Sequence, residues 1–360
     1  MLTADFDYEL PPERIAQTPL AERDQARLLV DAGPGRRPHH AVVRDLPALL
    51  APGDVVVVND TRVLPARVAV RRASGGAAEV LLLERVDGWW EALVRPSRKL
   101  KPGEVVHAGE DAAIEIGDDL GEGRRRVRFV ASRDLADDLA TLDLAGTVPL
   151  PPYITEPLDD DERYQTVYAH HPGSAAAPTA GLHLTEAVLD ALRARQIRVE
   201  TVDLQVGLGT FRPIATDAVD DHVMHRERYA VPVSTQAAIA ARPPGARVVA
   251  VGTTTLRALE AWAATGAAAG HTDLFIRRPY RFAVVDLLLT NFHLPRSSLL
   301  VLIDAFVGPR WRELYASALA EDYRFLSFGD AMLLTRTADG ATPGAQIGEA
   351  TSQSAEAAGS

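Results

Sequence analysis

The stretch Asp54-Val55-Val56-Val57-Val58-Asn59-Asp60-Thr61-Arg62 decides how this 360-residue chain is organised. Its valines form a short apolar, β-branched run, which is typical of a strand buried on both faces of a sheet. We predict that the polar residues from Asn59 onward lie at the carboxyl end of that strand, where an α/β sheet exposes its ligand crevice.

From Ala66 to Val130 the chain shows short strand patterns and turn signals but no helical pattern. Dipeptides such as Gly75-Gly76 and Asp87-Gly88 separate the strands. Strands spaced about 8–12 residues apart without helices between them favour a small barrel. We predict an inserted all-β barrel domain at 63–149, which ends at the stiff segment Pro149-Leu150-Pro151-Pro152. The predicted strands are 66–71, 78–83, 89–94, 105–107, 112–116 and 127–130.

Beyond this segment, helix and strand patterns alternate, which indicates α/β layers. Thr185 is a plausible N-cap for an amphipathic helix at 186–196. The predicted fold class is an α/β main domain, formed by 1–62 and 150–336, that is interrupted by the inserted all-β barrel domain. The other predicted elements are strands at 247–251, 284–289 and 299–303 and a helix at 255–264.

Composition limits the class of protein. Hydrophobic residues make up 47% and charged residues 24%, which is ordinary for a globular chain and excludes wholesale disorder. Only the tail, 337–360, lacks large apolar side chains, and we expect it to be disordered. There is no apolar run near the ~18 residues of a membrane span, no secretory signal and no cysteine. We therefore expect a cytoplasmic protein without disulfides or a thiol nucleophile.

Charge is unevenly distributed along the chain. The net charge of −11 argues against a generic nucleic-acid binder, which would usually be basic. The segment 95–101 nevertheless carries four positive charges and no acidic residue, and it includes the only two lysines, Lys99 and Lys101. Such a cluster is either a solvated face or a contact for a polyanion.

Six segments hold more polar and glycine residues than packing requires. One of them, Gly252-Thr253-Thr254-Thr255, joins a predicted strand to a helix, a geometry suited to an anion or a carboxylate. Another places His183 just before the helix that begins near Thr185. The six segments are 59–67, 177–185, 206–211, 222–225, 252–255 and 291–295.

Several common chemistries are poorly supported. The sequence Asp220-Asp221-His222-x-x-His225 offers metal-ligand types, but it lacks the His-Glu-x-x-His spacing and a third distant ligand. No Gly-x-Ser-x-Gly elbow and no Gly-x-x-x-x-Gly-Lys phosphate loop occur, which argues against a serine nucleophile and against nucleotide hydrolysis.

Together these segments resemble one family, S-adenosylmethionine:tRNA ribosyltransferase-isomerase of queuosine biosynthesis. The resemblance runs from Phe6-Asp7-Tyr8-Glu9-Leu10-Pro11 to Phe325-Leu326-Ser327-Phe328-Gly329-Asp330-Ala331-Met332 and implies an α/β domain interrupted by a β-barrel. Its most specific motifs are 59–67, 149–154, 164–168, 177–183, 206–211, 251–254 and 290–295.

The resemblance implies an unusual reaction. The ribosyl group of S-adenosylmethionine is transferred to 7-aminomethyl-7-deazaguanine in a tRNA, which gives epoxyqueuosine and releases adenine and methionine. A base must remove the C5′ proton that the sulfonium acidifies, an acid must protonate adenine, and the acceptor ammonium must lose a proton. No metal and no cofactor beyond S-adenosylmethionine as co-substrate is implied. The expected partners are this tRNA and S-adenosylmethionine, with no membrane, and we expect a monomer.

The resemblance also implies the site residues. Histidines suit the proton transfers because the ordinary pKa of imidazole is near 6.5. The catalytic candidates are His183, His225 and His293, with base and acid unassigned. The substrate-binding candidates are Asn59, Arg62, Arg67, Thr179, Gly181, Gly207, Gly209, Thr210, Phe211, Gly252, Thr253, Thr254, Asn291 and Asp330. The RNA-binding candidates are Arg98, Lys99 and Lys101, and Arg62 and Arg67 are also expected near RNA phosphates.

Of the histidines, His183 is the one for which we make a structural prediction. We expect it on a surface loop with few packing contacts. The helix N-terminus that follows would disfavour the imidazolium and keep the ring neutral.

The chain departs from the family pattern at four positions. Arg278 and Pro279 stand where the family usually has Pro-Gly, Ala283 stands at a usual lysine, and Asp304 stands at a usual small residue. The departures at Arg278, Pro279 and Ala283 leave one alternative open, which is ribosyl transfer to a free deazapurine or other small molecule. A separate alternative is a non-catalytic RNA-binding protein, against which the intact His183, His225 and His293 motifs argue. The tRNA set is not specified by the sequence.

Overall fold

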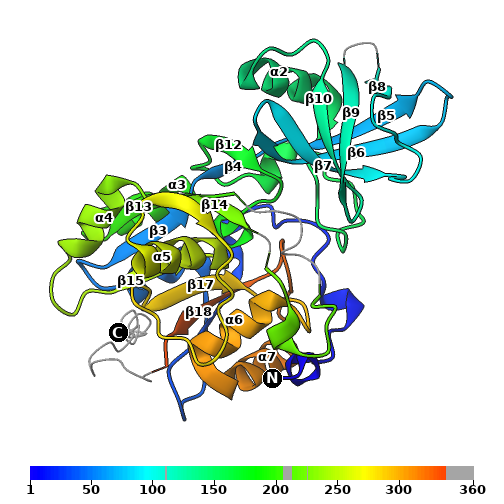
Figure 1. Ribbon diagram of the computed structural model, residues 1–360. Coiled ribbons are helices and arrows are strands. Elements are labelled where there is room, and N and C mark those ends of the chain that lie inside the picture. Colours follow the sequence, from blue (N-terminus) through cyan, green and yellow to red (C-terminus); the bar gives the residue numbers. More distant parts are fainter. Residues whose placement is uncertain (110–111, 206–212, 225, 338–360) are drawn as a thin grey trace, which may run out of the picture.

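The computed structural model describes residues 1–109, 112–205, 213–224 and 226–337. Figure 1 shows two bodies, an α/β unit with helices on both sides of a sheet and a β-barrel that stands to one side of it. A small two-stranded sheet of β4 (Thr61–Val63) and β12 (His171–Ser174) lies between them. The predicted fold class is confirmed.

The main sheet is built around the valine strand. β3 (Val55–Asn59) is buried throughout and is the fourth of nine described strands, in the order β16-β14-β13-β3-β15-β17-β18-β1-β2. β13, β3, β15 and β17 are parallel, and β18 runs antiparallel to β17. The strand bounds are β1 (Arg27–Val30), β2 (His39–Val42), β13 (Arg198–Leu204), β14 (Glu227–Ala230), β15 (Val248–Val251), β16 (Ala269–Thr272), β17 (Leu287–Asn291) and β18 (Ala331–Thr335).

Helices cover both faces of this sheet because the central strands are apolar on both sides. In β3, Val55 and Val57 face one core, whereas Val56 and Val58 face the other. The first core contains residues of α4 (Val233–Ala240), α5 (Thr253–Thr265), α6 (Ser298–Val307) and α7 (Trp311–Ala320); the second contains residues of α1 (Leu46–Leu49) and α3 (Glu186–Ala194).

The barrel begins after β4, which belongs to the small two-stranded sheet and not to the main sheet. Its strands pair in the order β11-β5-β6-β7-β10-β9-β8, and β5 also pairs with β8, which closes the barrel. Its apolar core is separate and lies within residues 64–145, which supports the insertion bounds 63–149 that we propose. The bounds are β5 (Arg67–Arg72), β6 (Ala77–Val86), β7 (Trp89–Arg95), β8 (Val105–Ala108), β9 (Ala112–Gly121), β10 (Arg124–Phe129) and β11 (Gly146–Thr147).

Three predicted elements differ from the structure. Residues 299–303 are not a strand: they lie in helix α6, which Ser297 caps through its hydroxyl. A short apolar run fits a buried helix as well as a buried strand, so its pattern could not decide between them. The last strand of the parallel set is β17 at Leu287–Asn291, later than 284–289. The barrel also holds one helix, α2 (Leu135–Ala145), so it is not purely β.

Two further observations concern the ends and surface of the chain. The tail that we expect to be disordered lies outside the described residues, except Thr337, whose N–H binds the Phe306 carbonyl at 2.9 Å. No helix in the described parts of the chain combines the length and apolarity needed to cross a membrane.

Candidate active site

A pocket opens where the parallel strands end. Asn291 is the last residue of β17, and Gly252 directly follows β15, so both lie at the carboxyl edge of the sheet. Helix α3, which precedes β13, packs on one face of the sheet, and helix α5, which follows β15, packs on the other. The chain therefore continues from β3 toward β13 on one side and from β15 toward β17 on the other, so the strand order reverses between β3 and β15. Such a switch point is where open α/β sheets bind ligands.

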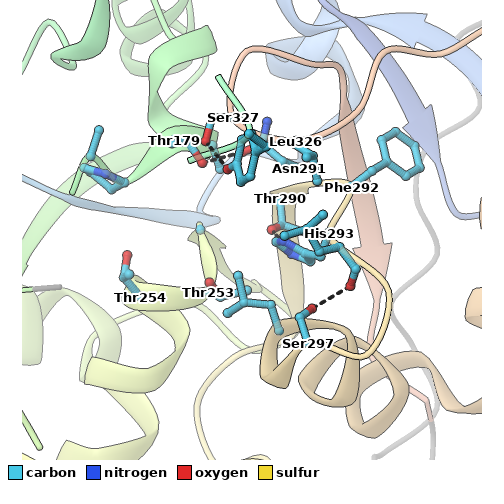
Figure 2. A pocket seen from close by; sticks show the side chains of 17 residues that line it. Thr179, Thr253, Thr254, Thr290, Asn291, Phe292, His293, Ser297, Leu326 and Ser327 are labelled. Atoms are coloured by element: carbon cyan, nitrogen blue, oxygen red, sulfur yellow. Dashed lines mark hydrogen bonds between the residues drawn. The ribbon is translucent and has the colours of Figure 1, made fainter. Parts of the chain in front are cut away.

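The space inside the pocket, counted together with its solvent-open mouth, is about 610 Å³. Its described lining contains hydroxyls, one amide and one imidazole, but no Asp, Glu, Lys or Arg. Figure 2 shows the polar members converging on the cavity from different elements. The lining residues are Tyr153, Ala177, Pro178, Thr179, Ala180, Gly252, Thr253, Thr254, Thr290, Asn291, Phe292, His293, Leu294, Ser297, Leu299, Leu326 and Ser327.

The N-terminus of α5 forms one wall. Gly252 precedes the helix with φ +89° and ψ 153°, a conformation that is essentially restricted to glycine. Because glycine has no side chain, it cannot cap the first N–H groups of the helix. Thr253 and Thr254 begin the helix and line the pocket, so their N–H groups and the helix dipole favour a negative ligand group there.

His293 lies in the pocket and is held from several sides. The ring atom Nε2 is 3.1 Å from Thr290 Oγ1. The backbone N–H of His293 donates to the Tyr315 hydroxyl, and its backbone carbonyl accepts from the Tyr8 hydroxyl at 2.6 Å. Burial lowers the pKa of His293 to about 3. The ring is therefore neutral at pH 7, with one ring nitrogen unprotonated.

His183 is connected to the pocket through Asn291. Thr179 Oγ1 donates to Asn291 Oδ1 at 2.9 Å, and Asn291 Nδ2 lies 3.0 Å from His183 Nε2. The same Nδ2 donates to the Asp330 carbonyl at 3.4 Å, and a carbonyl can only accept, so this atom is the amide nitrogen. His183 Nε2 is therefore the acceptor, which places the ring proton on Nδ1.

The prediction that His183 lies on a surface loop is wrong. The residue ends a short 3₁₀ helix, Thr179–His183, and is only 5% exposed. Burial is the main cause that lowers the pKa of His183 to about 4, and Arg324 and Arg23 lower it further against a hydrogen bond with the Arg23 backbone. The ring is neutral as expected, but chiefly because of burial and not because of the following helix.

Sequence reasoning missed a hydroxyl pair in the pocket. Tyr153 Oη and Ser327 Oγ lie 2.7 Å apart, although the residues are 174 positions apart in the chain. Burial raises the pKa of Tyr153 to about 12, against the effect of the hydrogen bond to Ser327. Both residues fall within motifs quoted for the family resemblance, which is the only signal that could have identified them.

Several predicted substrate-binding residues contact protein groups in the described structure. Asn59 binds the backbone N–H and carbonyl of Leu204 and lies 3.3 Å from Thr254 Oγ1. A Cβ at Gly181 would lie 2.0 Å from the Tyr168 hydroxyl oxygen, so this glycine permits close packing. The Asp330 carboxylate accepts hydrogen bonds from the backbone N–H groups of Arg27 and Arg324, each at 2.8 Å. Burial raises the pKa of this carboxyl group.

The predicted basic residues fall into two groups. Arg62 forms an ion pair with Glu162, and Arg67 lies 3.8 Å from Glu79, so a carboxylate neighbours each. Arg98, Lys99 and Lys101 are exposed on the barrel loop that follows β7. The predicted residues Gly207, Gly209, Thr210, Phe211 and His225 lie outside the described residues. Within the described ranges no group of three or more His, Asp and Glu is placed to hold a metal ion.

The four departures from the family pattern lie away from the pocket lining. Two of them compensate each other: Arg278 Nε donates to Asp304 Oδ2 at 2.5 Å, and Trp311 Nε1 donates to the other carboxylate oxygen. Ala283, which stands where the family usually has lysine, donates its backbone N–H to the Glu260 carboxylate. None of the four residues therefore contributes to the described pocket lining.

Known proteins match the chain over nearly its whole length. A model of the family described as "Queuosine biosynthesis protein" matches residues 3–334. The S-adenosylmethionine:tRNA ribosyltransferase-isomerase of Rubrobacter xylanophilus is 50% identical over 335 residues, which cover 93% of this chain and 98% of that relative. A protein of the same name from Thiobacillus denitrificans is 50% identical over 345 residues, with the same coverage. A crystal structure of S-adenosylmethionine tRNA ribosyltransferase from Thermotoga maritima has a TM-score of 0.53 and 36% identity, covering 91% of this chain and 99% of that chain.

Proposed function

The chain belongs to the queuosine biosynthesis family, and we propose that it acts as an S-adenosylmethionine:tRNA ribosyltransferase-isomerase. The observation that carries this proposal is the 50% identity over 93% of the chain to relatives of that one name. In the proposed reaction the ribosyl group is transferred to 7-aminomethyl-7-deazaguanine in tRNA and isomerised to give epoxyqueuosine. Adenine and methionine leave.

The pocket at the carboxyl edge of the sheet is the proposed site of S-adenosylmethionine. Its hydroxyls and the Asn291 amide can hydrogen-bond ribose and adenine, which carry no formal charge. The methionine carboxylate suits the N-terminus of α5 at Thr253 and Thr254, where N–H groups and the helix dipole favour an anion. Because the described lining holds no carboxylate, S-adenosylmethionine would be oriented by hydrogen bonds and not by an ion pair.

We assign a proton-accepting role to His293. The residue lines the pocket, and its neutral ring can take a proton from C5′ or from the acceptor amine. His183 does not line this pocket, and its Nε2 already accepts from Asn291. We therefore assign His183 to the positioning of the Asn291 amide, with Thr179 fixing the other end of that amide.

The test is release of adenine. The purified protein, given S-adenosylmethionine and a tRNA that carries the deazaguanine base, should release one adenine per modified tRNA. Omission of the tRNA should abolish release, whereas supply of the free deazapurine alone should not restore it. Release with the free base would support the small-molecule alternative, and no release under any condition would support the non-catalytic RNA-binding alternative.

The departures at Arg278, Pro279, Ala283 and Asp304 do not favour a different acceptor, since none lines the pocket. We propose that the reaction needs no metal and that the monomer is active. Turnover should therefore survive a chelator such as EDTA, and light scattering during size exclusion should give about the mass of one chain. Loss of turnover that a divalent ion restores would contradict the metal-free reaction.

A further inference from the structure

The barrel presents a segment at 95–101, here called the cationic loop, that begins with the last residue of β7. It contains Arg95, Arg98, Lys99 and Lys101, all exposed. No carboxylate of the described residues lies within ion-pair distance of any of these four side chains. Four positive charges are thus concentrated on a short stretch of surface, with no ion-pair partner among the described residues.

The cationic loop is held in one conformation by contacts that leave its charges free. Leu100 is fully buried in the barrel core, so its neighbours Lys99 and Lys101 are held at the surface. The Lys99 N–H donates to the Pro96 carbonyl at 3.1 Å and closes a turn. The Ser97 carbonyl accepts from Arg125, which is itself 5% exposed and paired with Asp119. Fixing the loop in advance lowers the entropy cost of binding a partner.

Several other arginines of the same barrel lie beside carboxylates. Arg124 lies 3.7 Å from Glu91, Arg128 lies 2.7 Å from Glu115, and Arg133 lies 3.2 Å from Asp137. A positive residue that already faces a carboxylate releases fewer counterions when it meets a polyanion. The cationic loop therefore differs from these three arginines in that its charges have no carboxylate partner among the described residues.

We infer that the cationic loop is a phosphate-backbone contact for the tRNA substrate. The inference rests on the proposed function, because a tRNA is the polyanion which that function requires. Flexible lysine ammonium groups and an arginine fork match phosphate oxygens without reading sequence. The protein's net charge of −11 would otherwise repel RNA, so an un-neutralised patch is needed to hold it.

The test compares two triple variants that remove the same formal charge. The first is Arg98→Ala, Lys99→Ala and Lys101→Ala; the control is Arg124→Ala, Arg128→Ala and Arg133→Ala. Binding of unmodified tRNA is measured by fluorescence anisotropy between 50 and 200 mM KCl, without S-adenosylmethionine. The first variant should bind about tenfold more weakly, and the magnitude of its log Kd against log salt slope should fall by about 2–3. The control should keep a slope close to that of the wild type.

Equal slopes for the wild type and the first variant would overturn the inference and identify the loop as a solvated face. Equal loss in both triple variants would also overturn it, since only overall charge would then matter. The KM for S-adenosylmethionine should not change in either variant. Since binding is measured without turnover, failure of the proposed reaction would appear separately, as a wild type that binds tRNA but releases no adenine.

Discussion

The pocket at the sheet edge and the cationic loop of the barrel differ in the exposure and the charge of their polar side chains. The pocket is buried and holds hydroxyls, an amide and a neutral imidazole, whereas the loop is exposed and holds only positive charge. A small uncharged surface can orient reacting atoms through directional hydrogen bonds. Exposed charge provides affinity that is long-ranged and insensitive to exact geometry. The difference assigns chemistry to one region and RNA capture to the other.

The largest effect should come from His293, since it is the described imidazole that lines the pocket. His293→Gln keeps hydrogen-bonding capacity but cannot accept a proton, so turnover should fall by ~10²-fold or more with little change in KM for tRNA. His183→Gln keeps an acceptor for Asn291 and should cost less than tenfold. Steady-state adenine release measures both. A His183→Gln loss as large as that of His293→Gln would identify His183 as a proton-transfer residue.

Acid should destabilise the fold through the buried histidines, whereas the barrel loop should contribute nothing. Both folded-state pKa values lie below the ordinary ~6.5, so the unfolded chain binds more protons between that pH and the folded values. Stability is complete above pH 6.5 and decreases as pH falls toward 4, by about 2 kcal/mol per histidine at pH 5.

Urea unfolding at pH 7 and pH 5 would measure this loss. His183→Gln should reduce the difference in unfolding free energy between pH 7 and pH 5 by the contribution of one histidine, about 2 kcal/mol. The matched variant His107→Gln, on the exposed surface of the barrel, should leave the difference unchanged. A wild type that is equally stable at both pH values would show that these rings are not held neutral by burial.

Gly252 tests whether the α5 N-terminus belongs to the binding surface. A Cβ there would meet only Thr254 Oγ1 at 3.6 Å and Ala180 Cβ at 3.8 Å, so Gly252→Ala strains the backbone without a clash. It should destabilise the protein by ~1–3 kcal/mol and raise the KM for S-adenosylmethionine. The control is Gly266→Ala at the other end of α5, with φ +71° and open space around it. It should lower stability without changing KM; equal KM effects would exclude the helix N-terminus as a ligand site.

Thr179→Val should give the smallest effect in the pocket. It removes one hydrogen bond to Asn291 Oδ1, worth about 1 kcal/mol, and so should lower turnover about fivefold. Thr166→Val is the control, because that buried hydroxyl has no partner among the described residues. A larger loss in the control would mean that packing of this segment, and not the Thr179 to His183 chain, determines activity.

The parts of the fold that the sequence predicted are those with strong local signals. β3, the barrel strands and the Thr185 cap follow from valine runs, turn dipeptides and a side chain that can accept an N–H. Helix α6 was mispredicted because every residue from Leu299 to Ile303 is apolar. Such a run shows no alternation of polar and apolar residues that could distinguish a helix from a strand.

The site was predictable only where its residues fall together in the sequence. Gly252, Thr253 and Thr254 follow one strand, and their place at a helix N-terminus could be predicted. The Tyr153–Ser327 contact and the burial of His183 depend on segments far apart in the chain. No local pattern specifies which distant segment will cover a side chain, and burial is what sets the pKa of His183.

The central claim is that the pocket performs the chemistry and the cationic loop holds the RNA, independently of each other. The most direct test is a double-mutant cycle between His293→Gln and the triple variant Arg98→Ala, Lys99→Ala and Lys101→Ala, with kcat and KM for tRNA measured by adenine release. We expect His293→Gln to lower kcat alone, the triple variant to raise KM alone, and the two effects to combine without interaction. A triple variant that lowers kcat as much as His293→Gln, or a coupling above about 1 kcal/mol between the two sites, would contradict this division.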